Sequence, residues 1–178
     1  MPLQAEERGR AVAELQASAA ALLDAVDGLS DAQWDFKPAP DRWSIAECVE
    51  HIALTEDYYF DLIQEKVLTS PAQPRGPDAR SKDEAVLAMM RDRTSTRVAF
   101  GNLAPSGRWS SPPLVIGHFQ SRRTRLIDYI RTTTDELREH FECHRAAGLI
   151  DGYQWILLAS GHVRRHTEQI LEVRRNLG

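Results

Sequence analysis

The chain has 178 residues, of which 42% are hydrophobic and 27% charged, a composition typical of one globular domain over residues 1–178 and not of a disordered or fibrous protein. Its formal net charge of -4 argues against a general nucleic-acid binder. The sequence contains no run of about 18 apolar residues and no pattern of a signal peptide, so we expect no membrane span. Two cysteines are too few for a disulfide framework, and a reducing cytoplasm fits best.

The first half of the chain predicts two helices and a crossover. Apolar residues recur at alternating steps of three and four from about Leu3 to Leu29, which predicts one long helix. In "WSIAE", Ser44 can cap a second helix while Glu47 reaches back to the cap amide, and the helical pattern continues to about Ser70. The stretch "TSPAQPRGPDAR" that follows contains three prolines and a glycine, so it predicts a long crossover.

The second half predicts three more helices. "SKDE" at residues 81–84 is a second capping box, and we expect its helix to end near residues 101–102. "APSGRWSSPPLVIG" indicates an irregular connection, which precedes a fourth helix marked from 119 to 141 and a last helix over about 153–177. No strand-like alternation of useful length occurs. The predicted class is all-α, a bundle around four long helices with a short extra helix.

Three histidines occupy inward faces of the predicted helices. His162 and His166 lie four residues apart on the last helix, and side chains at that spacing are neighbours. His51 lies in the middle of the inward face of the second helix. A lone histidine on such a face is usually a core residue with a satisfied ring. Bundles, however, build metal sites from side chains on facing helices, so we predict that these three imidazoles converge on a divalent metal ion.

Three neutral imidazoles suit a catalytic metal site. A cation satisfies one ring nitrogen of each histidine and leaves the other to donate to a carboxylate, a carbonyl or water. Three protein ligands also leave coordination positions open, as catalytic sites do. An open position activates a water or a thiol by lowering its pKa toward neutrality. Because imidazole accepts zinc, nickel, copper and iron, the residues alone leave the metal open.

The other histidines and cysteines have simpler interpretations. His140, Cys143 and His144 have the spacing of a local metal clip, but we interpret them as the last turn of the fourth helix, where imidazoles interact favourably with the macrodipole. His118 stands at a helix entrance without a partner by spacing, and Cys48 is interpreted as a small buried hydrophobe. No aromatic residues interleave the arginines of "SRRTR" and "VRRH" for base stacking, so we expect no nucleic-acid partner.

Two stretches carry a family resemblance, namely "DRWSIAECVEHIALTEDYY" and "LIDGYQWILLASGHVRRHTEQILEV". With a histidine amid the second helix and HxxxH followed by "QI" on the last, the chain resembles the DinB/YfiT superfamily over nearly its whole length. The resemblance implies a four-helix bundle with a long crossover between helices two and three. It implies that His51, His162 and His166 bind a divalent metal, often nickel or zinc. It also implies frequent homodimers and a relation to bacterial S-transferases that use low-molecular-weight thiols.

The leading hypothesis is a cytoplasmic metalloenzyme that hydrolyses a small molecule or transfers a low-molecular-weight thiol to it. We assign no general base, because the capping box occupies Glu47 and Tyr58 lies two turns beyond His51. A non-catalytic module that binds a metal or a small ligand as a sensor would use the same histidines. A structural bundle or dimerisation module with coincidental core histidines is the third alternative, and it predicts no bound metal.

Overall fold

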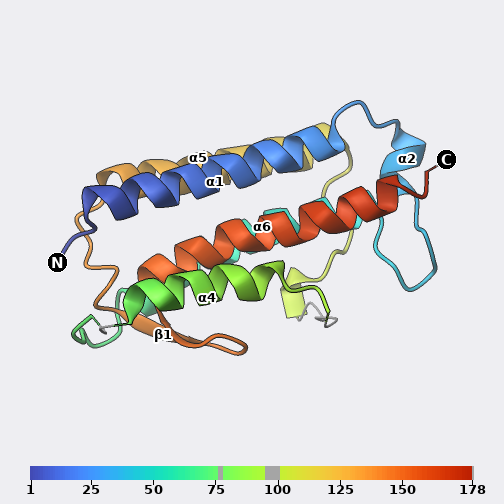
Figure 1. The fold of residues 1–178 in the computed structure, drawn as a ribbon. Helices are drawn as coiled ribbons and strands as arrows, with labels where there is room; N and C mark the ends of the chain where they lie inside the picture. Colours follow the sequence, from blue (N-terminus) through green and yellow to red (C-terminus); the bar gives the residue numbers. More distant parts are fainter. Residues whose placement is uncertain (76–77, 95–100, 178) are drawn as a thin grey trace.

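The computed structural model of the protein describes residues 1–75, 78–94 and 101–177. Within these ranges four long helices form a bundle (Figure 1): α1 (Ala5–Val26), α3 (Ile45–Leu62), α5 (Pro112–Thr132) and α6 (Gly152–Arg174). Both α1 and α3 pack against α5 and α6, so the order around the bundle is α1, α5, α3, α6. α1 and α6 run in the same direction and α5 runs opposite to them (Figure 1). The predicted all-α, four-helix class is confirmed.

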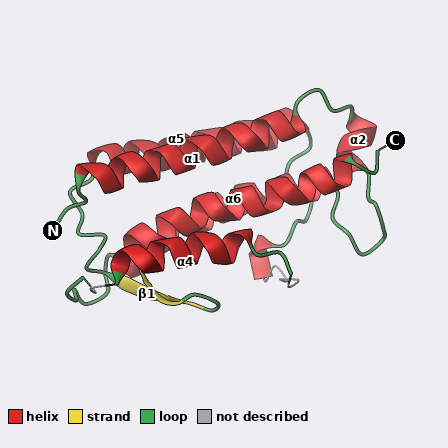
Figure 2. Ribbon diagram, viewed as in Figure 1, coloured by secondary structure: helices red, strands yellow, loops and turns green. Residues whose placement is uncertain are grey.

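Smaller elements extend and connect these helices. α2 (Asp31–Asp35) precedes α3, the π-helical turn η1 (Ile63–Val67) continues α3, and η2 (Gly101–Leu103) is a 3-10 turn. α4 (Ala79–Arg91) packs against α6 outside the ring of four helices. β1 (Phe141–His144) and β2 (Gly148–Asp151) form an antiparallel hairpin that leads directly into α6 (Figure 2). In the described ranges, no helix combines the length and apolar character needed to cross a bilayer.

Both helices that carry the candidate site begin at strong caps. The Ser44 hydroxyl accepts a hydrogen bond from the Glu47 amide at 3.2 Å, and the Glu47 carboxylate accepts one from the Ser44 amide at 2.8 Å. The predicted capping box of this helix is therefore confirmed. α6 begins in the same way, because the Asp151 carboxylate accepts from the Gln154 amide at 2.7 Å. These caps set where each helix starts, and hence which faces its histidines occupy.

The third predicted helix is wrong at both ends. α4 begins before the expected capping box, and Ser81 lies inside its first turn, where its hydroxyl donates to the Asp78 carbonyl. The helix ends at Arg91, well before residue 101. The carboxylate of Asp92 accepts a hydrogen bond from the backbone amide two residues later at 2.9 Å, and such local bonds compete with helix formation. Part of the predicted remainder, residues 95–100, lies outside the described residues.

The fourth predicted helix, 119–141, is shifted. α5 begins at Pro112. Proline fits the first helical position, because an amide hydrogen at that position has no partner within the helix and its absence costs nothing. The helix ends at Thr132, and the hydroxyl of Thr133 accepts from the Asp135 amide at 3.0 Å. The hairpin was not predicted, because strands of four residues are too short to show a clear alternation.

The described buried apolar residues form two clusters along the bundle. On α6 one cluster ends at Ala159 and the other begins at Val163. A buried polar layer lies between them and draws on all four bundle helices; its members are Ser18, His51, Thr55, Glu56, Arg123 and His162. Within this polar layer, Arg123 donates to the Glu56 carboxylate at 3.0 Å and to the Ser18 hydroxyl at 2.9 Å. Two of the three candidate histidines therefore lie in a layer where the fold already buries polar groups.

Candidate metal centre

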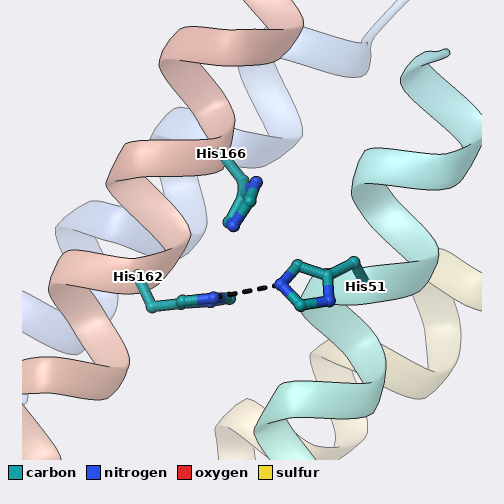
Figure 3. Close-up of side chains that lie close together, drawn as sticks. All are labelled: His51, His162 and His166. Carbon is teal, nitrogen blue, oxygen red and sulfur yellow. Dashed lines mark hydrogen bonds between the residues drawn. The ribbon is translucent and has the colours of Figure 1, made fainter. Parts of the chain in front are cut away.

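Two histidines of α6 and one of α3 point toward one another between these helices (Figure 3). His162 and His166 lie one turn apart on the same face of α6, with ring centroids 4.5 Å apart. The ring centroid of His51 lies 4.9 Å from that of His162 and 4.7 Å from that of His166. One ring nitrogen of each histidine lies within 4.8 Å of the other two. The structure thus brings together the three histidines that the sequence singled out, and their role as ligands stays a prediction.

Each ring has a separate hydrogen-bonding partner for its Nδ1 atom. The partners are the Leu103 carbonyl for His51 at 2.7 Å, the Thr55 hydroxyl for His162 at 3.3 Å and Oε1 of Gln169 for His166 at 3.0 Å. The Thr55 hydroxyl also donates to backbone carbonyls of α3, at 2.9 to 3.0 Å. A neutral imidazole carries a single N–H and a carbonyl can only accept, so the hydrogen of His51 lies on Nδ1 and its Nε2 keeps a lone pair.

The ring nitrogens of two histidines also approach each other directly. Nε2 of His51 and Nε2 of His162 are 3.2 Å apart (Figure 3). Imidazole nitrogen suits divalent transition metals, and a ligating histidine usually donates its other ring N–H to an outer partner. The donor set and the convergence of the three rings therefore fit a divalent cation.

Burial keeps two of the candidate ligands, His51 and His166, uncharged at neutral pH. It lowers the pKa of His51, with the hydrogen bond to the Leu103 carbonyl acting in the opposite direction. Burial and, next, the nearby His51 lower the pKa of His166 to about 3. The unprotonated imidazole is the form that binds a metal. These two rings are therefore in the binding form without a change of pH.

The three histidines line a cavity of about 1280 Å³. Its other walls come from α4, η2 and the hairpin. Trp43 covers the histidines, with its ring centroid 5.0 Å from that of His51 and 5.9 Å from that of His166. Trp155 also lines the cavity and contacts His144 of the hairpin at a centroid distance of 5.3 Å. Pockets for small molecules measure about 300–1,000 Å³, so this cavity has room for a substrate beside the histidines.

The acidic side chains that line the cavity are largely engaged in ion pairs. Glu172 pairs with Arg93 at 2.7 Å and approaches Arg42 at 3.8 Å. Glu47 is held by its capping box and by Lys37 at 2.8 Å. Both carboxylates are therefore already engaged by cations or by a backbone amide. This agrees with leaving Glu47 out of a catalytic role.

The sequence of residues 14–170 matches the model of the DinB superfamily, which is most of the chain. The chain belongs to the DinB superfamily. This confirms the family resemblance carried by the helix-two stretch and by the HxxxH stretch of α6.

Two proteins of Bacillus subtilis are similar to this DinB-superfamily chain, one in sequence and one in fold. The uncharacterised protein YuaE of strain 168 is 25% identical over 150 residues, which is 84% of this chain and 88% of that protein. The solved structure of YfiT, described as a probable metal-dependent hydrolase with an unusual four-helix bundle topology, matches with a TM-score of 0.65. It is 20% identical and the match covers 99% of this chain and 90% of YfiT. At this identity the likeness shows the shared fold alone.

The hairpin residues do not form the helix end that the sequence suggested. Cys143 and His144 lie on β1 and His140 immediately before it, so the interpretation as a last helical turn is wrong. His140 Nδ1 donates to the Ser70 carbonyl at 2.7 Å, whereas His144 Nδ1 accepts from two backbone amides at 3.0 and 3.2 Å. Cys143 and His144 are neighbours on the strand, so their side chains point to opposite faces. Within the described residues, the side chains of His140, Cys143 and His144 form no metal-binding group.

Three further candidates have other roles. Nε2 of His118 lies 2.8 Å from the Asp57 carboxylate, outside the cavity. Cys48 belongs to an apolar cluster and burial raises the pKa of its thiol, as expected for a small buried hydrophobe. Tyr58 lines the cavity, but burial and then Glu142 raise the pKa of its hydroxyl, which disfavours a role as a base.

Sequence reasoning missed the groups that orient the three rings. Gln169 follows His166 by three residues, a helical spacing that could have revealed it. Thr55 lies four residues after His51, on the same face of α3. Leu103 carries no such signal, because it lies 52 residues after His51 and acts through its backbone carbonyl.

Proposed function

We propose that this chain is a metal-dependent enzyme in which His51, His162 and His166 bind a divalent cation through Nε2. The observation that carries the proposal is the convergence of one ring nitrogen from each of three histidines within 4.8 Å of one another, while every Nδ1 has an outer partner of its own. The description of YfiT as a probable metal-dependent hydrolase supports the same class of function. Following the family resemblance, we propose nickel or zinc as the cation, bound within a single domain over residues 1–178.

The cavity beside the histidines suits chemistry on a small molecule. A bound cation polarises a substrate oxygen and lowers the pKa of a coordinated water or thiol, which suits hydrolysis or the transfer of a low-molecular-weight thiol. Leu103, Thr55 and Gln169 hold the rings in the ligating tautomers. Trp43 covers two of the rings and restricts access of water from its side. Nucleic acid and membrane surfaces are not the proposed partners.

Metal content tests the ligand assignment directly. Plasma mass spectrometry of untagged wild-type protein is expected to find near-stoichiometric nickel or zinc, and His51→Ala and His162→Ala are expected to lose it. His118→Ala is the matched control, because this histidine is bound to Asp57 outside the cavity, and it is expected to retain the metal. Wild-type protein without metal, even after incubation with zinc or nickel, would overturn the proposal and favour a structural or dimerisation module.

Turnover distinguishes an enzyme from a binding module. Metal-loaded protein is incubated with esters and amides, and separately with electrophiles and low-molecular-weight thiols. Consumption of a substrate that His162→Ala abolishes supports a hydrolase or a thiol transferase. Binding without consumption indicates the non-catalytic sensor. Assembly as a homodimer and a cytoplasmic location stay predictions.

A further inference from the structure

Glu50 of α3 is a nearly buried carboxylate, 7% exposed, that holds a loop instead of lining the cavity. Its Oε1 accepts hydrogen bonds from the backbone amides of Ser106 at 2.8 Å and Arg108 at 3.2 Å. Its Oε2 accepts from the Gly107 amide at 2.8 Å, and the Ser106 hydroxyl adds a longer contact of 3.3 Å. Three consecutive backbone amides therefore converge on one side chain.

A glycine makes this convergence possible. Gly107 has a φ of 77°, a left-handed conformation that glycine adopts without steric cost. Consecutive amides that turn toward one anion in this way form an anion-binding nest. A Cβ at position 107 would meet no atom within 4 Å, so the requirement for glycine is conformational and does not come from crowding. We call the Glu50 carboxylate and the amides of residues 106–108 the loop clamp.

The loop clamp lies next to the group that orients His51. Leu103 is 6% exposed, and its carbonyl accepts the Nδ1 hydrogen of His51 at 2.7 Å. Only Ala104 and Pro105 separate Leu103 from the clamped amides, and both line the cavity. Glu50 and His51 are adjacent on α3, so one helix carries both the carboxylate that fixes the loop and the ring that the loop orients.

We propose that Glu50 is a positioning residue, which fixes the Leu103 carbonyl so that His51 keeps its hydrogen on Nδ1 and its lone pair on Nε2. The part that concerns cation binding rests on the proposed function; the part that concerns the tautomer does not. When the loop clamp is broken, the Leu103 carbonyl loses its fixed place and His51 gains access to the other tautomer. In that tautomer Nε2 carries the hydrogen and cannot bind a metal.

Two variants break the loop clamp from opposite sides. Glu50→Gln removes the charge and places an amide group where only acceptors fit, and Gly107→Ala strains the left-handed backbone without changing any charge. Asp57→Asn is the control for charge, since Asp57 is another α3 carboxylate, bound to His118 and Arg122 of α5. Gly28→Ala is the control for backbone strain, because Gly28 also has a left-handed φ, of 69°, beyond the end of α1, and does not belong to the loop clamp.

Two measurements are made on each full-length protein. Competition with a chelating dye gives the Kd for Ni²⁺, and nitrogen-15 NMR of the metal-free protein gives the tautomer of His51. Loss of outer partners of this kind typically weakens metal binding about 10- to 100-fold, so we expect this change in Glu50→Gln and Gly107→Ala, together with a loss of the Nδ1–H tautomer. Both control variants are expected to keep the wild-type Kd and tautomer.

The proposal is overturned if both clamp variants keep the wild-type Kd and tautomer, or if Asp57→Asn weakens binding as much as Glu50→Gln does. If Glu50→Gln does not fold, Gly107→Ala decides between these results. If the wild-type protein binds no Ni²⁺, the proposed function fails. The tautomer of His51 in the metal-free variants then still shows whether Glu50 acts through Leu103.

Discussion

Replacing His162 with leucine separates what the cation needs from what the fold needs. In the metal-free protein this side chain is 8% exposed, and its Nε2 lies 3.2 Å from that of His51 and its Nδ1 3.3 Å from the Thr55 hydroxyl. Burying a polar group costs about 1–3 kcal/mol, a cost that leucine avoids while it keeps most of the bulk. The change also loses the two long polar contacts, each worth about 1 kcal/mol. Because these terms offset each other, we expect a net change of at most about 1 kcal/mol without metal, or about 2–4 °C in Tm.

A bound cation makes the two proteins differ in stability. At a free concentration of about 100 times Kd, a ligand that binds only the folded state stabilises it by about 2.7 kcal/mol. For a chain of this size the gain corresponds to a rise in Tm of about 5–10 °C. His162→Leu retains only two of the three imidazoles and is expected to gain far less. The variant should therefore match the wild type in chelator within about 4 °C and be the less stable protein in metal.

Thermal unfolding followed by circular dichroism, with EDTA or with excess NiCl₂, measures both effects. An equal rise in Tm for wild type and His162→Leu on adding nickel would refute the assignment of His162 as a ligand. A Tm of the variant in EDTA more than about 4 °C below that of the wild type would refute this balance of terms. His118→Leu is the control, because it breaks the contact with Asp57 outside the cavity and should keep the full rise with nickel.

Two further predictions concern the metal-free protein. The pKa of His166 is lowered to about 3 by burial and then by His51, below the value of about 6.5 in the unfolded chain, so stability is fully present above about pH 6.5 and falls as the pH drops toward 3. Urea unfolding between about pH 7 and pH 5 should show this fall, by up to about 1.4 kcal/mol per pH unit, and His166→Gln should show less of it. In the polar layer, Glu56→Gln leaves the buried Arg123 without its counter-charge and should cost about 3–5 kcal/mol, whereas Glu56→Leu combined with Arg123→Met should recover most of that loss. Equal urea midpoints for the single and double variants would contradict this reasoning.

Helix periodicity made much of this fold predictable. The start of α3 could be read because Ser44 and Glu47 satisfy each other within four residues, a purely local arrangement. Helix ends were less predictable, since Asp92 and Thr133 make side-chain hydrogen bonds to nearby amides that compete with the helix. The hairpin was missed for a related reason, because its short strands are stabilised by pairing with each other and carry little pattern of their own.

The sequence by itself determined the helical class and the three histidines of the candidate site, because side chains at helical spacing share a face wherever the helix is placed. Only the tertiary structure decided that α3 and α6 present those faces to each other, that a cavity opens beside them and that one ring nitrogen of each histidine lies within 4.8 Å of the other two. The Leu103 carbonyl and the amides bound by Glu50 show why. Every residue has a carbonyl and nearly every residue has an amide hydrogen, so these groups leave no mark in the sequence, and their role depends on how the chain packs.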